Sequence, residues 1–390
     1  MKDSPYDLVL FGASGFTGAL TADYLAKHAP PGLRWALAGR NRTKLEAVRA
    51  RLGTDVDLLQ ADVDDAGSLA AMAAAARVVI TTVGPYIQYG EPLVAACAAA
   101  GTDYVDLTGE PEFVDRMYLA HHARAVETGA RIVHCCGFDS VPYDLGVQFT
   151  VEQLPQGVSI HVEGLVRAGG RPSGGTLRTV ITTLSRGAQH VQAHRERRRL
   201  EPRPEGRSSR AVAGKIHRSQ GFWAVPLPTV DPQIVARSGA ELDRYGPDFS
   251  YSHYAAVKRL PVVVAGMAGM GLLAAAAQVP PVRAGLLNRI KAGDGPDEAR
   301  RAGSWFKVRF VGSGGGQRVV TEVAGGDPGY GETAKMLGES ALCLALDELP
   351  ETAGQVTPAV AMGPALRRRL IAAGLTFRVI PPGEAPAAAR

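Results

Sequence analysis

The sequence predicts a doubly wound parallel α/β sheet followed by a second, smaller α+β domain. Between residues 7 and 135, short apolar runs alternate with longer amphipathic stretches, a pattern typical of helices that cross over between parallel strands. A glycine-rich turn directly follows the first apolar run, and the repeating pattern ends after residue 146. The length of 390 residues exceeds what one hydrophobic core usually needs, which favours two domains.

Six apolar runs in the first part are expected to be strands, at residues 7–11, 34–39, 56–62, 77–84, 103–107 and 131–136. The stretches between them are predicted to be helices, at 17–28, 42–52, 66–76, 91–101 and 113–128. Because crossovers of this length join parallel neighbours, the six strands should form one parallel sheet.

The second part mixes strands and helices. Residues 158–169 alternate as a strand does, and a glycine-rich turn then leads into a helix that ends near residue 188. Residues 186–218 are rich in arginine and are expected to be a solvated helix and loop. Residues 304–325 predict a hairpin around "GSGGGQ", and a helix should cover 329–349.

These elements suggest three segments. Residues 1–140 should bind a nucleotide, and residues 141–345 should form the α+β domain that holds a substrate. Residues 346–390 are expected to return towards the first domain.

Composition narrows the class of protein. Hydrophobic residues make up 46% and charged residues 21%, which is ordinary for a globular chain. The net charge of +5 favours anionic ligands, but no zinc-finger spacing or RNA-binding aromatic motif points to nucleic acid. Four cysteines are too few for a disulfide framework, and no signal-peptide pattern is evident, so we expect reduced thiols and a cytoplasmic location. No metal site is expected.

Residues 260–282 contain no charged residue and are long enough to cross a bilayer. They consist largely of alanine and glycine, with proline near both ends. Three interpretations are open: a buried core helix, a helix that contacts a membrane surface or an acyl chain, and a membrane span.

The first glycine-rich turn has the spacing G-x-x-G-x-x-G instead of the more familiar G-x-G-x-x-G. Gly12 would allow a sharp turn, Gly15 a close approach of phosphates, and Gly18 tight packing of helix on strand. The hydroxyls of Ser14 and Thr17 could cap the helix or donate to phosphate. We therefore expect a dinucleotide to contact the whole loop: Gly12, Ala13, Ser14, Gly15, Phe16, Thr17 and Gly18.

The second predicted strand ends without the carboxylate that usually holds the ribose 2′-hydroxyl of NAD. Arg40, Asn41 and Lys44 stand there instead. A guanidinium can bind a 2′-phosphate bidentately, so NADPH is the expected cofactor. Arg40 should make the main contact with its 2′-phosphate. The alternative is that Arg40 and Lys44 are surface charges.

Two later strand ends complete the expected cofactor site. Asp62 could accept from the adenine amino group or cap the following helix. Val83, Gly84, Pro85 and Tyr86 should line the path to the nicotinamide, because ligands of open α/β sheets bind at the carboxyl ends of strands.

Several motifs together resemble the saccharopine dehydrogenase-like oxidoreductases, and among them the bacterial trans-acting enoyl reductase branch. They are "VLFGASGFTG", "AGRNRTKL", "VGPY", "GTDYVDLTGE", "CGFDSVPYDLG", "GGRPSGGTLRT" and "GQVTPAVAMG".

The resemblance implies a Rossmann-type NADP-binding domain beside a smaller α+β domain. For the enoyl reductase branch it also implies reduction of a double bond in a polyketide or lipid intermediate, free or on a carrier protein. An imine or carbonyl reductase of saccharopine type is an alternative, as is a non-catalytic nucleotide-binding protein on membranes or lipid. A homodimer and membrane association through 260–282 are further expectations.

Three residues are candidates for the chemistry: Tyr86, Asp139 and Tyr143. Tyr86 could place a phenol near the nicotinamide or serve packing. Asp139 could touch substrate or cap the helix that starts near residue 141. Tyr254 and Lys258 have the Y-x-x-x-K spacing of short-chain dehydrogenases, but they lie far beyond the predicted sheet, so a catalytic role is not expected. The neighbouring His134, Cys135 and Cys136 are assigned to core packing.

Overall fold

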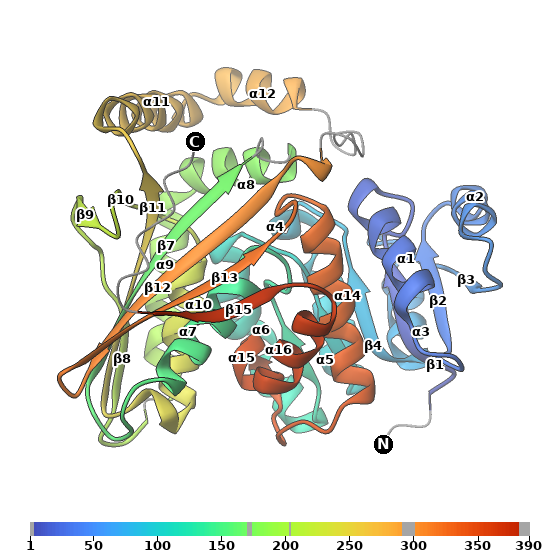
Figure 1. Cartoon of the computed structure of the whole chain (residues 1–390). Helices are drawn as coiled ribbons and strands as arrows, with labels where there is room; N and C mark the ends of the chain where they lie inside the picture. The colour runs from blue at the N-terminus through green and yellow to red at the C-terminus, as the bar shows by residue number, and fades with distance from the viewer. Residues whose placement is uncertain (1–3, 170–173, 203, 291–300, 382–390) are drawn as a thin grey trace.

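The computed structural model describes residues 4–169, 174–202, 204–290 and 301–381 (Figure 1). Two sheets organise these residues: a seven-stranded sheet built mostly from the first part of the chain and an eight-stranded sheet built from the second. This arrangement confirms the predicted fold class.

The first sheet is entirely parallel and has the order β14-β6-β5-β4-β1-β2-β3. Its strands are β1 (Tyr6–Phe11), β2 (Trp35–Gly39), β3 (Asp57–Gln60), β4 (Ala76–Thr81), β5 (Asp103–Val105), β6 (Arg131–Val133) and β14 (Gly354–Val356). The sequence predicted the first six. The seventh comes from the C-terminal segment, which pairs with β6.

Alternate residues of β1 face opposite layers of helices, as a sheet buried on both sides requires. Leu8 and Leu10 belong to one core, whereas Val9 and Phe11 belong to another. The first layer contains α1 (Phe16–His28), α2 (Arg42–Leu52) and α14 (Gly331–Leu346). The second contains α3 (Ala66–Ala75), α5 (Glu91–Ala100) and α6 (Pro111–Thr128).

Helix α14 packs against α1 and β4, so its contacts place it with the first sheet. The sequence grouped this helix with the second domain because its position along the chain follows the hairpin. The core of the first layer continues into the second sheet through Phe306, Val308 and Phe310. The two domains therefore share one hydrophobic core.

The second sheet is mixed, with the order β15-β13-β12-β7-β11-β10-β9 and β8 paired to β11. Its strands are β7 (Ile160–Gly169), β8 (Ser208–Ala211), β9 (His217–Ser219), β10 (Phe222–Pro226), β11 (Asp248–Val257), β12 (Trp305–Gly314), β13 (Gln317–Gly325) and β15 (Thr376–Ile380). The predicted hairpin is β12–β13, and it turns through Gly315 and Gly316, which have φ of 57° and 75°. Positive φ at both positions is what a tight two-residue hairpin turn requires.

The remaining helices cover this sheet or connect it to the first. They are α4 (Tyr86–Tyr89), α7 (Val141–Glu152), α8 (Gly174–Ser185), α9 (Gly187–Leu200), α10 (Asp231–Glu241), α11 (Leu260–Gln278), α12 (Pro280–Arg289), α15 (Pro358–Ala361) and α16 (Gly363–Ala372), with a 3-10 turn at Asp243–Tyr245. Helix α7 packs on β7, β12 and β13 and links the two sheets.

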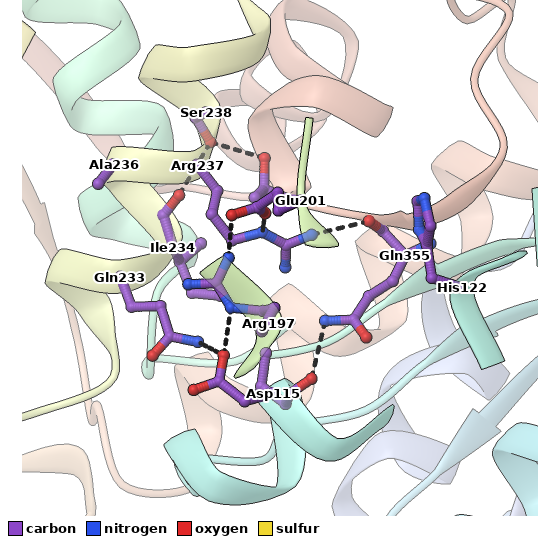
Figure 2. A network of polar contacts seen from close by, with 12 residues as sticks. Asp115, His122, Arg197, Glu201, Gln233, Ile234, Ala236, Arg237, Ser238 and Gln355 are labelled. Carbon is purple, nitrogen blue, oxygen red and sulfur yellow. Dashed lines mark hydrogen bonds and ion pairs between the residues drawn. The ribbon is translucent and has the colours of Figure 1, made fainter. Parts of the chain in front are cut away.

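The arginine-rich segment 186–218 was expected to be a solvated helix and loop, and this expectation is wrong for Arg197. Arg197 of α9 is buried and forms ion pairs with Asp115 of α6 and with Glu201 (Figure 2). Arg237 of α10 donates to Glu201 at 2.8 Å and to the carbonyl oxygen of Gln355 in β14 at 2.9 Å. This network ties α9 and α10 to α6 and β14 of the first domain.

The apolar segment 260–282 forms α11 and the start of α12, and it lies on the outside of the molecule (Figure 1). Only Val263 and Ala277 of α11 are buried. The interpretation as a buried core helix is therefore wrong. Among the described residues, α11 is the one helix that is long and apolar enough to cross a membrane.

We expect Arg197→Met to lower the free energy of unfolding by about 3 kcal/mol, because it leaves the buried carboxylate of Asp115 without its guanidinium partner. Arg199→Met is the matched control, since Arg199 is exposed on the same helix. Urea unfolding of both variants, followed by circular dichroism, measures the difference. Equal stability of the two variants would show that the network contributes nothing to the fold.

Candidate active site

The glycine loop connects β1 to α1 at the carboxyl edge of the first sheet, and the fold itself explains two of its three glycines. Gly12 has φ of 89°, a conformation that favours glycine. A Cβ on Gly18 would lie 2.1 Å from the carbonyl oxygen of Gly12, so only glycine fits there. This close contact is the packing of helix on strand that the sequence predicted.

Neither the backbone conformation nor a close contact within the described protein requires glycine at position 15. A Cβ there would meet only the carbonyl oxygen of Gly12, at an ordinary distance of 3.4 Å, and its φ of −79° suits any residue. Gly15 and Ser14 are exposed. A ligand that approaches the backbone closely would account for glycine at this position, as the phosphates of a dinucleotide do.

The start of α1 is open to an anion. Gly15 is its N-cap, and among the described residues no side chain accepts from the first backbone N–H groups. Ser14 and Thr17 therefore do not cap the helix, which was one of their two predicted roles. Uncapped N–H groups and the positive end of the helix dipole favour a phosphate. Phe16 and Thr17 are half-buried, and Ala13 is buried beneath the loop.

Arg40 and Lys44 lie at the adjacent end of β2, and both are exposed. Neither side chain has a hydrogen-bond or ion-pair partner within the described parts of the chain. Asn41 caps α2 by accepting from the backbone N–H of Lys44 at 2.9 Å, so its side chain has a structural role. Two free cations beside the glycine loop fit the 2′-phosphate of NADPH.

Asp62 is half-buried after β3, and its carboxylate accepts from the backbone N–H of Asp64 at 3.3 Å. The cap of α3 is Asp65, which accepts from Gly67 and Ser68. The alternative role of Asp62 as a helix cap is thus filled by another residue, and contact with adenine stays a prediction.

Tyr86 follows Val83, Gly84 and Pro85 at the end of β4, and its side chain points into the protein. The hydroxyl donates to the carbonyl oxygen of Thr81 at 3.0 Å, and burial raises the pKa of the phenol well above its ordinary value. The carboxylate of Glu110 accepts from the backbone N–H groups of Tyr86 and Ile87, both at 2.9 Å. These hydrogen bonds hold the end of β4 in place, and the phenol proton of Tyr86 is directed at the protein and not at a substrate.

The loop between β6 and α7 carries unusual backbone geometry. Cys135 has φ of 63° and Ser140 has φ of 101°. Among the described residues, Gln220 is the one other non-glycine residue with positive φ. Such conformations cost about 1–3 kcal/mol each and cluster at functional sites. This loop is therefore a candidate part of the active site.

Asp106, just after β5, holds this loop in place. One carboxylate oxygen accepts from the backbone N–H of Cys135 at 2.9 Å and from Thr108 at 3.1 Å. The other accepts from the hydroxyl of Tyr104 at 2.9 Å and pairs with Nδ1 of His134 at 2.6 Å. His134, Cys135 and Cys136 are buried, in agreement with their assignment to the core, and both thiols are free.

Asp139 sits on the same loop beside a second carboxyl group, Asp231 at the start of α10. Its carboxylate lies against Gly109, where a Cβ would come within 3.1 Å of Oδ2. Burial and then the neighbouring Asp231 raise the pKa of Asp139 to about 7, and burial raises the pKa of Asp231 to about 6. Asp139 is half-buried whereas Asp231 is fully buried, so Asp139 is the more exposed member of the pair.

Asp139 does not cap α7, because Ser140 is the N-cap and makes no side-chain cap. Ser140 instead donates its hydroxyl to Asp231 Oδ1 at 3.0 Å. His253 Nε2 lies 3.6 Å from Asp231 Oδ2, and the hydroxyl of Tyr251 lies 2.8 Å from His253 Nδ1. Burial lowers the pKa of His253 to about 3, so this histidine is neutral beside the carboxylate.

Tyr143 belongs to the same cluster. Its buried ring meets His253 edge-on at 4.8 Å and Phe138 at 5.5 Å between centroids. Burial raises the pKa of its phenol well above the ordinary value, and Asp231 and Asp139 raise it further. The structure thus brings together Asp139 and Tyr143 of the three predicted catalytic residues and directs Tyr86 elsewhere.

Asp231, Tyr251 and His253 were not predicted from the sequence. They come from α10 and β11 of the second sheet, and Asp231 follows Ser140 by 91 residues. No local motif marks them. Tyr254 and Lys258 lie on and after strand β11, not on a helix of the first sheet, so they do not form the short-chain dehydrogenase pair. Within the described ranges, no group of His, Cys, Asp or Glu could hold a metal ion.

The comparisons with known proteins agree with the fold and with an NADP-binding domain. Residues 8–133 match the family described as the saccharopine dehydrogenase NADP binding domain. A saccharopine dehydrogenase (L-Glu forming) of Saccharomyces cerevisiae has the same fold, with a TM-score of 0.57 over 96% of this chain and 100% of that one, at 13% identity.

Two mycobacterial relatives are similar along nearly their whole length. A protein of Mycobacterium tuberculosis named for trans-acting enoyl reduction is 41% identical over 411 residues, covering 96% of this chain and 97% of the relative. A trans-acting enoyl reductase of Mycobacterium ulcerans is 37% identical over 409 residues, covering 95% and 96%.

The fold, the matched NADP-binding domain and the relatives therefore define an NADP(H)-dependent oxidoreductase with a Rossmann-type domain. Within that class, the chain belongs to the trans-acting enoyl reductase family of saccharopine dehydrogenase-like proteins. The residues present fit the cofactor: the open N-terminus of α1 and Gly15 suit the pyrophosphate, and Arg40 and Lys44 suit the 2′-phosphate.

We expect Arg40→Ala to weaken NADPH binding by about 10- to 100-fold, the usual value of a charge-assisted hydrogen-bonded contact, and to leave NADH binding unchanged. Fluorescence titration of both nucleotides measures this. Arg42→Ala is the control, because Arg42 pairs with Glu46 on the exposed face of α2. If Arg40→Ala lost equal affinity for NADPH and NADH, Arg40 would not bind the 2′-phosphate.

Proposed function

We propose that the protein uses NADPH to reduce the carbon–carbon double bond of an apolar enoyl substrate, with Asp139 as the proton donor. The observation that carries this proposal is the carboxyl group of a half-buried residue, with a pKa raised to about 7, on a strained loop at the carboxyl edge of the cofactor-binding sheet. Family membership supports the type of bond that is reduced.

The chemistry requires a hydride and a proton. Bound NADPH supplies the hydride from its nicotinamide ring. Addition of this hydride to the β-carbon of an enoyl group moves the π electrons towards the carbonyl oxygen. Asp139 then gives its carboxyl proton to the α-carbon, and the double bond becomes a single bond with two new C–H bonds. The Asp139 carboxylate regains its proton from water before the next turnover.

The surroundings of Asp139 suit a general acid at neutral pH. The negative charge of Asp231 disfavours a second carboxylate beside it, so the proton stays on the more accessible Asp139. Ser140 and the neutral His253 orient Asp231. Tyr143 stands beside both carboxyl groups with its ring packed between Phe138 and His253, which gives it a positioning role.

The substrate is proposed to be a polyketide or lipid intermediate, free or presented on a carrier protein. The relatives are named trans-acting enoyl reductases, and this name supports a substrate that another protein presents. A cytoplasmic location, a homodimer and contact of residues 260–282 with a membrane surface stay predictions, and they add no residue to this site.

The reaction is tested by supplying NADPH with either an apolar α,β-unsaturated thioester or a mixture of a 2-oxoacid and an amine. We expect NADPH absorbance to fall only with the unsaturated thioester. One NADPH should be consumed for each saturated product found by mass spectrometry. Consumption with the oxoacid and amine instead would support the imine reductase alternative and overturn the proposal.

Asp139→Asn should lower kcat by about 10²- to 10⁴-fold, the usual contribution of a general acid. The wild-type rate should fall as the pH rises through about 7, because the acid form of Asp139 is lost there. In Asp231→Asn, removal of the neighbouring charge lowers the pKa of Asp139, so the same fall should begin at lower pH. A wild-type rate and pH profile in Asp139→Asn would exclude this residue as the proton donor.

A further inference from the structure

Helices α11 and α12 form an apolar arm on the outside of the second domain (Figure 1). We use "docking arm" for residues 260–289. The described chain has eighteen large apolar side chains that are exposed, and eight of them lie in this arm. Leu272 is 73% exposed and Val264 is 61% exposed, and a cluster of exposed apolar side chains of this kind marks an interaction surface.

The charged residues of the arm and the two that directly precede it are all basic. No Asp or Glu occurs between residues 258 and 290, and the four charged residues there are Lys258, Arg259, Arg283 and Arg289. Two precede α11 and two lie on α12, so the apolar stretch is bracketed by basic residues. Arg259 and Arg289 are exposed. This combination is complementary to an apolar layer covered by anionic headgroups.

The arm is held along the protein surface by α8. Gln278, the last residue of α11, donates to the carbonyl oxygen of Leu184 at 2.8 Å. Arg178 donates to the carbonyl oxygens of Leu287 at 2.9 Å and Ile290 at 3.2 Å, at the end of α12. These bonds fasten the end of α11 and the end of α12 to α8, and α11 itself packs alongside α8.

The composition of the arm distinguishes a bilayer from a protein partner. Residues 260–282 contain no aromatic residue and consist largely of alanine, glycine and valine. Protein interfaces are enriched in tyrosine, tryptophan and arginine and depleted of alanine, because they depend on large anchoring side chains. A lipid surface needs only apolar area and complementary charge.

The arm is also connected to the cofactor loop. At the other end of α8, the backbone N–H of Gly174 donates to the hydroxyl of Tyr330 at 3.3 Å. The ring of Tyr330 meets the ring of Phe16, in the glycine loop, edge-on at 4.8 Å. One helix therefore separates the docking arm from the residues that hold NADPH.

We propose that the docking arm binds the surface of an anionic lipid bilayer, with its apolar side chains among the acyl chains and its basic residues at the headgroups. Docking would hold the reductase where apolar substrates accumulate. The docking itself stands independently of the proposed reduction; only its use for substrate access rests on that proposal.

Vesicle flotation tests the docking. The full-length protein is mixed with vesicles of phosphatidylcholine alone or with added phosphatidylserine, and the bound fraction is measured at low and high salt. We expect binding to the anionic vesicles that weakens as salt rises. The variant Arg259→Gln/Arg289→Gln should lose about fivefold in affinity for each of the two charges removed.

Val264→Asp/Leu272→Asp should abolish binding, because both side chains are exposed and their replacement does not disturb the core. Leu200→Asp is the matched control, since Leu200 is 68% exposed outside the arm, and it should bind as the wild type does. NADPH titration of each variant checks that the protein is still folded. This control does not depend on whether the protein reduces enoyl thioesters.

Three results would overturn the proposal. One is a wild-type protein that does not float with anionic vesicles while it binds NADPH. Another is a wild-type dimer that Val264→Asp/Leu272→Asp converts to a monomer without any vesicle binding, which would assign the arm to a second copy. The third is membrane-bound protein that resists extraction with alkaline carbonate, which would indicate a span.

Discussion

The hydrogen bonds of Asp106 hold together the edge of the sheet on which the proposed chemistry depends. This one carboxylate receives backbone N–H groups from the loops after β5 and β6 and pairs with His134 and Tyr104 beneath them. Every one of these groups is buried, so each lost contact would leave a polar group unsatisfied. The positive φ of Cys135 is sustained by this fixed geometry, and Asp139 is placed by the loop that follows.

The sequence predicted those parts of the site that are local in the chain. The glycine loop, Arg40 and the end of β4 each follow a strand directly, and the carboxyl ends of parallel strands necessarily share one edge. Asp231 and His253 could not be found in this way, because β11 and α10 meet the loop after β6 only through tertiary packing. A short-range pattern contains no information on such a contact.

Two expectations from composition failed for the same physical reason. A run of arginines predicts a solvated face, yet Arg197 is buried because Asp115 and Glu201 compensate its charge. A buried core helix was one of three interpretations of the uncharged apolar segment, yet only Val263 and Ala277 of α11 find a buried position. Burial depends on the partners a residue finds as well as on its own polarity.

The acidity of Asp139 is a property of the assembled protein and not of the Rossmann-type domain alone. Burial at the junction contributes most to its raised pKa, and Asp231 of the second domain contributes next. Arg197 and Arg237 fasten α9 and α10 to α6 and β14, and Asp231 begins α10. The network that joins the domains therefore also keeps the second carboxyl group beside Asp139. Without that attachment, an aspartate on the same loop would be an ordinary surface carboxylate, ionised at neutral pH and unable to donate a proton.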